Sequence, residues 1–182
     1  MINFTYFSDF TLKGKEKIEL PLDNELTQQY SCVMIPGLVD IGGPWRVLPP
    51  GVHNATIEEV EKRFATSDIR KRIFSGFKNG VDALRKAGCR QIFLDGSFVM
   101  EKPIPGDFDA CWDPAGVDVK KLEPVLLDFS DMRKKQKDCF HGEFFPANLA
   151  ADGTNVFLDF FQTDRYTGKE KGIIRILLSK NK

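Results

Sequence analysis

The sequence predicts a small mixed α+β fold, and three observations lead to this class. Two segments with apolar residues at helical spacing come first, at about 56–64 and 68–86. Two short apolar segments of strand type follow, at 90–95 and 107–112. Further strand-like segments close the chain after a third helical region. This order is typical of a modest sheet, mixed or antiparallel, that is flanked by helices.

The organisation of the chain follows from its length and from its turn-forming residues. A chain of 182 residues with 42% hydrophobic residues is long enough for one hydrophobic core. Residues 1–35 are predicted to form an N-terminal arm or hairpin, because short apolar runs alternate there with charged turns. Residues 36–51 are rich in proline and glycine and are predicted to be loop. The main domain is then expected over 52–182.

The two helices have local start and stop signals. Thr56 is expected to cap the first helix, with Glu59 reaching back to complete a capping box. The second helix is predicted over 68–86, because its apolar residues recur with helical spacing. Gly88 is well placed to end it.

The remaining elements are short. The segment 90–95 is predicted to be a buried strand that ends at Gly96 and Ser97. After a proline-containing loop, 107–112 is predicted to be the next strand. The later expectations are a helix over 119–137 interrupted near Pro124, a hairpin of strands 139–145 and 155–161 turning at 151–153, and a last strand over 173–178.

Charge and cysteine content limit the classes of function. Lys plus Arg and Asp plus Glu number 26 each, and a net charge of zero argues against a general polyanion binder. The four cysteines are widely spaced, so their spacing does not predict a zinc site. The start of the chain has no signal-peptide pattern, and the sequence has no apolar run of membrane-spanning length. A cytoplasmic protein with free thiols and no membrane association is therefore expected.

The residues that indicate chemistry lie on the two central strands. Asp107 and Asp109 are two residues apart, so in a strand both side chains point to one face, about 7 Å apart. Such a pair can converge on Mg²⁺, which prefers oxygen ligands and substrate phosphates. Gly96 lets the backbone approach a ligand closely, and Ser97 adds a hydroxyl and an N–H for phosphate oxygens. An anion site next to a metal site is what phosphoryl or nucleotidyl transfer requires.

This pattern resembles the signature of the DNA polymerase beta-type nucleotidyltransferase superfamily. In that signature a Gly-Ser turn after one strand is followed, after a short gap, by Asp-x-Asp on the next strand. Here Gly96-Ser97 and Asp107-Phe108-Asp109 are separated by nine residues. A narrower resemblance, over about 47–178, is to an uncharacterised small bacterial family of this superfamily. It is carried by the segments 48–53, 58–64, 96–98 and 160–165.

The superfamily resemblance implies a third carboxylate that lies opposite the pair on a later strand. Asp159 is the first choice, because the apolar segment 156–161 makes it look like a buried acid whose cost of burial a metal would remove. Glu143, on the other strand of the expected hairpin, takes the role if Asp159 points away. Lys171, with Lys169, is a candidate for binding the triphosphate, and a solvated turn is the alternative reading of both.

The function implied is a metal-dependent nucleotidyltransferase with two Mg²⁺ ions held by Asp107, Asp109 and Asp159. It would move a nucleoside monophosphate from a nucleoside triphosphate, such as ATP, to a hydroxyl of RNA, protein or a small molecule, and release pyrophosphate. The acceptor is expected to bind the arm, the 36–51 loop or a separate protein. One alternative is a non-catalytic partner in a toxin–antitoxin or defence system, docking through its N-terminal arm. Another is a metal-dependent phosphohydrolase that uses the same acids.

Overall fold

One mixed sheet organises the chain. The structure is a computed structural model that describes residues 35–179, which belong to one compact unit. Its strand order is β1-β5-β2-β3-β4, so β1 and β4 are the edges. The strands are β1 (Gly51–Asn54), β2 (Gln91–Asp95), β3 (Phe108–Trp112), β4 (Gly142–Pro146) and β5 (Gly172–Leu177). The central strand β2 is antiparallel to both β3 and β5, whereas the outer pairs β1–β5 and β3–β4 are parallel.

The two predicted helices form as the sequence indicates. Helix α1 (Ile57–Phe64) begins with the expected capping box, in which Thr56 accepts from the Glu59 N–H at 3.2 Å and Glu59 accepts from the Thr56 N–H at 2.7 Å. Helix α2 (Asp68–Lys86) begins at Ser67, whose hydroxyl accepts from the Arg70 N–H. Both starts depend on residues three positions apart, so local sequence is sufficient to set them.

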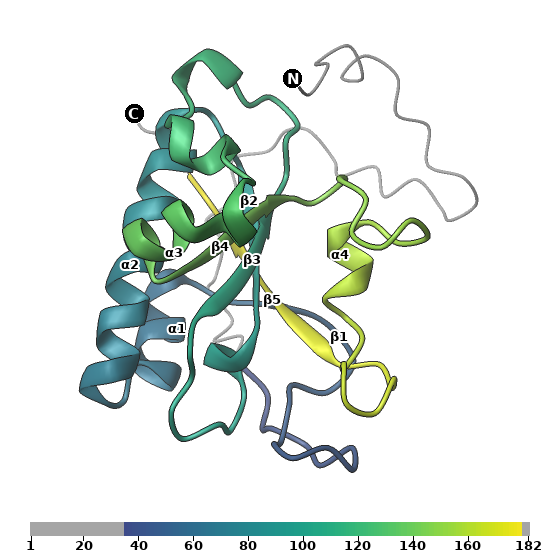
Figure 1. The fold of residues 1–182 in the computed structure, drawn as a ribbon. Coiled ribbons are helices and arrows are strands. Elements are labelled where there is room, and N and C mark those ends of the chain that lie inside the picture. The colour runs from purple at the N-terminus through teal and green to yellow at the C-terminus, as the bar shows by residue number, and fades with distance from the viewer. Residues whose placement is uncertain (1–34, 180–182) are drawn as a thin grey trace, which may run out of the picture. The chain divides into compact units, whose positions relative to one another are not determined.

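Helices α1, α2 and α3 (Lys134–Phe140) cover one face of the sheet (Figure 1). The main core lies between them and that face, and its largest fully buried members are mostly aromatic. Helix α2 comes very close to β4 at Gly80. The ring of Phe144 occupies the space that a Cβ at Gly80 would need. The core residues that project from the sheet are Ile92, Leu94, Phe108, Ala110, Trp112, Phe144, Ile174 and Ile176.

The predicted helix over 119–137 is wrong for most of its length. Three short 3₁₀ turns occupy Val119–Lys121, Pro124–Leu127 and Asp131–Arg133, and α3 begins only at Lys134. Pro124 starts a turn because it has no N–H to continue a preceding helix. Asp131, Met132 and Arg133 all have positive φ, which interrupts the helical path again.

The predicted hairpin is also wrong. Strand β4 forms, but its partner is β3, and the segment expected to be the second strand contains helix α4 (Phe157–Phe160). In Figure 1, α4 lies on the face of the sheet opposite α1, α2 and α3. Packing explains the change, because Phe157 stacks on Phe145 with ring centroids 4.0 Å apart and Phe161 meets the same ring edge-on at 5.6 Å. Tertiary contacts therefore override the strand propensity of this aromatic run.

Three other expectations have different outcomes. The last strand forms as β5, close to the predicted bounds. The loop reading of 36–51 holds for most of its length, although Val39 and Val47 form an isolated bridge and β1, which the sequence did not suggest, begins at Gly51. The predicted N-terminal arm falls outside the described residues except at Ile35. Within residues 35–179, the helices are all too short or too polar to span a bilayer.

Candidate active site

Three carboxylates form a row across the sheet. Asp95 on β2 is the register partner of Asp109 on β3, and Asp109 is in turn the register partner of Glu143 on β4. Register partners on neighbouring strands project to the same face, with strands about 4.8 Å apart. This face is the one opposite the main core, because the alternate residues Leu94, Ala110 and Phe144 point into that core. The row therefore faces α4 rather than the helical layer.

The loop between β2 and β3 adds Asp107 to this row. Asp107 comes directly before β3 and two residues before Asp109, on the same side of the strand. The Ser97 hydroxyl donates to the Asp107 carbonyl oxygen at 3.1 Å, which links the two ends of the loop. Ser97 thus fixes the position of the Asp-x-Asp segment through the backbone.

Gly96 is required by its conformation and by its neighbour. It has a φ of +82°, which favours glycine. A Cβ at this position would lie 2.5 Å from the Asp109 carboxylate oxygen and 2.7 Å from the Asp109 backbone nitrogen. What approaches Gly96 closely in this structure is Asp109, and the predicted approach of a ligand to this backbone stays a prediction.

Arg70 holds the same loop from the other side. Its buried guanidinium donates to the carbonyl oxygens of Phe98 at 2.7 Å, Met100 at 3.0 Å and Lys102 at 2.6 Å. It also donates to the Phe64 carbonyl at the end of α1, at 3.3 Å. A single side chain on α2 therefore orders the loop that carries Lys102 and Asp107. Helical spacing alone did not predict this role, because the loop carbonyls that Arg70 binds lie 28 to 32 residues further along the chain.

A cavity of about 410 Å³ lies at these carboxylates. It contains the predicted Gly96, Ser97, Asp107, Asp109 and Lys171 in its wall, so the structure brings five of the six predicted site residues together. The wall also holds the acids Asp95, Asp152 and Asp164. Its other cationic and aromatic side chains are Lys102, Arg165, Trp45, Phe160, Phe161 and Tyr166.

The electrostatics of the row favour a bound cation. Burial, followed by the charges of Asp107, Asp95 and Glu143, raises the pKa of Asp109 to about 7. Burial and the charge of Glu143 also raise the pKa of Asp107 above its ordinary range. Among residues 35–179, neither carboxylate takes part in an ion pair. A positive charge at this position would stabilise both ionised forms.

Lys171 is paired with Asp95 instead of lying free in a turn. Its ammonium makes a buried ion pair and hydrogen bond with the Asp95 carboxylate, and both side chains are almost fully buried. The solvated-turn reading is therefore wrong for Lys171. Burial raises the pKa of Asp95, while the Lys171 charge acts in the opposite direction. Lys169 is exposed and donates to the Ile41 carbonyl oxygen at 2.8 Å.

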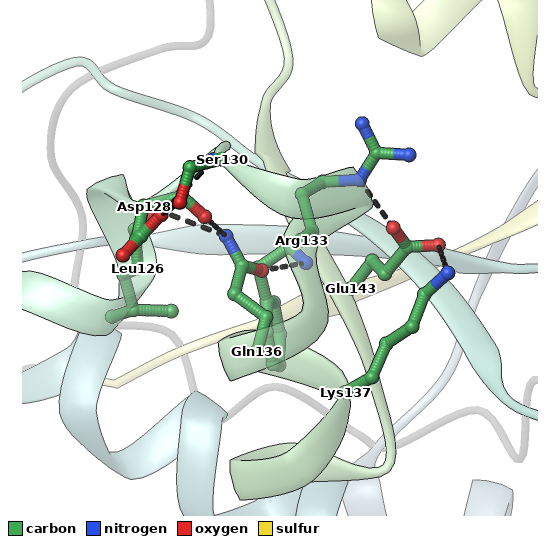
Figure 2. A network of polar contacts seen from close by, with 8 residues as sticks. Leu126, Asp128, Ser130, Arg133, Gln136, Lys137 and Glu143 are labelled. Carbon is green, nitrogen blue, oxygen red and sulfur yellow. Dashed lines mark hydrogen bonds and ion pairs between the residues drawn. The ribbon is translucent and has the colours of Figure 1, made fainter.

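Glu143 is also paired in this structure. Arg133 donates from Nε to one carboxylate oxygen, and Lys137 Nζ lies 3.6 Å from the other. Figure 2 shows these two side chains approaching the carboxylate of Glu143 from two sides. The Arg133 guanidinium also lies over the ring of Phe145, 4.8 Å from its centroid. Glu143 is therefore next to Asp109 but held by its own two cations.

A second part of the network in Figure 2 fixes α3 against β4. The buried Gln136 accepts from the Phe144 N–H at 2.8 Å and donates to the carbonyl oxygens of Leu126 and Asp128. Asp128 in turn accepts from Ser130. These bonds place the helix that carries Lys137, and so they set the surroundings of Glu143.

Asp159, the sixth predicted residue, lies elsewhere. It is exposed on the short helix α4, and it is absent from the cavity wall. The expectation that it is a buried acid on a strand is wrong, because α4 turns its apolar residues toward the sheet and leaves Asp159 outside. Glu143, the alternative, lies directly beside Asp109 in the sheet register.

The donor set fits a divalent cation held by two carboxylates. Asp107 and Asp109 supply hard oxygen ligands on one face, and Mg²⁺ commonly takes one or two carboxylates together with water and substrate phosphates. In the part of the chain that the structure describes, no three acidic, histidine or cysteine side chains already converge as a ligand set. The neighbouring carboxylates Asp95 and Glu143 are instead paired with Lys171 and Arg133.

Comparison with known families gives one match. The model described as "Family of unknown function (DUF6932)" matches residues 44–177, which is well over half of the chain. The chain belongs to this family. The matched DUF6932 segment begins just before Trp45 and ends with β5, so it contains every residue of the cavity wall. Comparisons with curated proteins and with solved structures gave no match.

Sequence reasoning missed several residues of this site. Asp95 is the last residue of the strand predicted over 90–95, and only the register of β2 on β3 places it beside Asp109. Trp45, Lys102, Arg165 and Tyr166 come from loops, and they reach the cavity through long-range contacts. Two local signals were present. The Gly-Ser turn begins the loop that contains Lys102, and the segment 160–165 of the narrower resemblance contains Arg165.

Proposed function

We propose that this protein is a metal-dependent nucleotidyltransferase, which moves a nucleoside monophosphate from a nucleoside triphosphate to a hydroxyl acceptor. The observation that carries the proposal is the position of Asp107 and Asp109. Both lie on one strand face, beside the Gly96–Ser97 turn, in the wall of a cavity that also presents Lys102 and Arg165. Carboxylates for a cation and cations for phosphate oxygens are the two requirements of this chemistry.

The residues have separate tasks in the proposed reaction. Asp107 and Asp109 would hold Mg²⁺, which when bound neutralises phosphate charge and favours ionisation of the attacking hydroxyl. Lys102 and Arg165 pair with triphosphate oxygens, and the Gly96–Ser97 turn keeps the loop in place. The acceptor oxygen forms a bond to the α-phosphorus, the bond from that phosphorus to the oxygen bridging to the β-phosphorus breaks, and pyrophosphate leaves. The hydroxyl proton is released to solvent.

Glu143 is our choice for the third carboxylate, in place of Asp159. It neighbours Asp109 in the sheet register and is buried, whereas Asp159 is exposed; neither residue is part of the cavity wall. Its role requires that Arg133 and Lys137 exchange their contacts with Glu143 for contacts with substrate phosphates. Glu143→Gln should therefore abolish transfer, and Asp159→Asn should leave it near the wild-type rate. The reverse result would assign the role to Asp159.

The test is transfer from each of the four nucleoside triphosphates, labelled at the α-phosphate, with Mg²⁺ and mixed RNA, protein and small-molecule acceptors. Asp107→Asn and Asp109→Asn should each lower transfer at least about 100-fold, since even changes to groups around metal ligands cost 10- to 100-fold. Asp82→Asn is the matched control, because Asp82 is an exposed acid on α2. Equal activity of all three variants would refute the proposal.

The products also separate the alternatives. Release of pyrophosphate together with a labelled acceptor supports transfer. Release of inorganic phosphate with a nucleoside diphosphate would identify a phosphohydrolase that uses the same acids. Absence of any turnover and of any nucleotide binding would favour a non-catalytic partner protein.

A further inference from the structure

The cavity has an aromatic part that the proposed chemistry does not use. Trp45, Phe160 and Tyr166 are in its wall, and they come from the 36–51 loop, from α4 and from the turn that follows α4. None of these segments carries Asp107 or Asp109, the two carboxylates proposed to hold the metal. Phe160 is 42% exposed and Tyr166 is 53% exposed, although aromatic rings of this size ordinarily lose more of their surface on folding.

Two loops are held together where these rings lie. Lys169 donates to the Ile41 carbonyl oxygen at 2.8 Å, which ties the turn after α4 to the 36–51 loop. Gly43 packs beside the same turn, so that an added Cβ would lie 3.5 Å from both Asp164 and Thr167. Trp45 and Tyr166 are thus brought to one cavity by contacts between segments more than a hundred residues apart.

Tyr166 has a fixed backbone and an organised ring. The buried Asp164 accepts from the Tyr166 N–H at 3.2 Å and from the Thr167 N–H and hydroxyl, both at 2.8 Å. Arg165 donates to the Tyr166 hydroxyl at 2.8 Å, and its guanidinium lies 4.9 Å from the ring centroid. Within residues 35–179, neither Trp45 nor Tyr166 stacks on another aromatic ring. Arg165 covers one face of the Tyr166 ring, so the opposite face of this ring and the ring of Trp45 are the surfaces available for a ligand.

We propose that Trp45 and Tyr166 bind the base of a nucleotide by stacking, while its phosphates reach toward Lys102 and Arg165. This inference rests on the proposed function and names the part of the substrate that the carboxylates do not contact. A planar base suits aromatic rings in a cavity wall, since base–aromatic stacking is strong and accepts every base. The cavity of about 410 Å³ is within the range of small-molecule sites.

The test compares ligands with and without a base. Nucleoside 5′-monophosphates and ribose 5-phosphate are titrated by calorimetry, in EDTA and again in Mg²⁺. The monophosphates should bind more tightly than ribose 5-phosphate by at least about fivefold under both conditions. They should also quench the fluorescence of Trp45, which is followed against the second tryptophan, Trp112, since Trp112 is buried in the main core.

Variants assign this preference to the two rings. Trp45→Leu and Tyr166→Leu should each weaken monophosphate binding by about 5- to 100-fold and leave ribose 5-phosphate binding unchanged. Leu177→Ala removes an exposed apolar side chain outside the cavity and is the control. Trp112 fluorescence reports whether Trp45→Leu is folded. Equal binding of the two ligand classes, wild-type binding by both ring variants, or no saturable binding of any nucleotide would overturn the proposal.

The outcome can be told apart from failure of the proposed function. If the rings determine monophosphate binding but Asp107→Asn and Asp109→Asn change no reaction, the base site stands and the transferase proposal fails. If transfer depends on the two acids while the ring variants keep the wild-type KM for the triphosphate, the base site is refuted and the transferase proposal stands.

Discussion

Replacing Asp109 by asparagine should stabilise the metal-free protein at alkaline pH, although it removes a proposed functional group. The pKa of this carboxyl is about 7 in the folded chain, against an ordinary value of 3.8. Burial and three neighbouring acids disfavour the ionised form, so the folded state retains the proton over a pH range in which the unfolded state has lost it. Asparagine has a similar shape and carries no charge.

The sign and the size of the effect follow from this difference. Below about pH 3, both states are protonated and the wild type loses nothing. As the pH rises toward 7 the unfolded state releases its proton first, so the free energy of unfolding falls, and the loss is complete above the folded pKa. The separation between 3.8 and about 7 corresponds to at most about 4 kcal/mol. Asp109→Asn should show no such loss.

The assay is urea unfolding in EDTA across this pH range, followed by the fluorescence of Trp112, which is buried in the main core. The variant should match the wild type at about pH 3 and exceed it by up to about 4 kcal/mol at about pH 8. Mg²⁺ added at the higher pH should stabilise the wild type and not the variant, because ligands stabilise the state that binds them. A stability difference that is constant with pH would refute the reasoning.

Three further substitutions test how the site is held. Gly96→Ala should destabilise the fold by more than about 2 kcal/mol in urea unfolding, since it combines a positive φ with a contact 2.5 Å from Asp109. The control Gly168→Ala, at φ +70° with open space around it, should lose only about 1 kcal/mol in the same experiment. Arg70→Met should lower stability by about 3 kcal/mol and increase amide exchange over residues 97–107, because three loop carbonyls lose their donor; unchanged exchange there would contradict this role. Asp95→Asn should lower the free energy of unfolding by about 3 to 5 kcal/mol, because it leaves Lys171 buried and unpaired. Adding Lys171→Met should restore a large part of that loss, which a double-mutant cycle of unfolding free energies would measure.

Local signals predicted the elements that depend on local contacts. The capping pair of Thr56 and Glu59 fixed the start of α1, and helical spacing gave α2 its bounds. The Gly-Ser turn and the Asp-x-Asp pair were found for a similar reason, because Gly96 and Asp109 reflect constraints on one short stretch of backbone. The structure also brings these residues into the wall of one cavity.

Features that depend on distant contacts could not be predicted. Glu143 joins the row of Asp95 and Asp109 through the pairing of β4 with β3, and Gln136 of α3 accepts a hydrogen bond from β4. The segment of Phe157 to Phe161 looks like a strand by composition, yet packing on Phe145 makes it helical and moves Asp159 away from the row. Sequence spacing carries no information about either contact.

The alternation of β3 has a consequence for insertions and deletions. Phe108 and Ala110 point into the main core, while Asp109 faces the cavity and Cys111 packs in the smaller cluster beside α4. A shift of the strand by one residue would bury the Asp109 carboxylate in the apolar layer and expose Phe108 to the cavity. The shift is therefore unfavourable on both faces of the sheet. Strand β3 should therefore tolerate substitution at single positions far better than any change in its length. Its register is set independently by the apolar core on one face and by the cavity on the other.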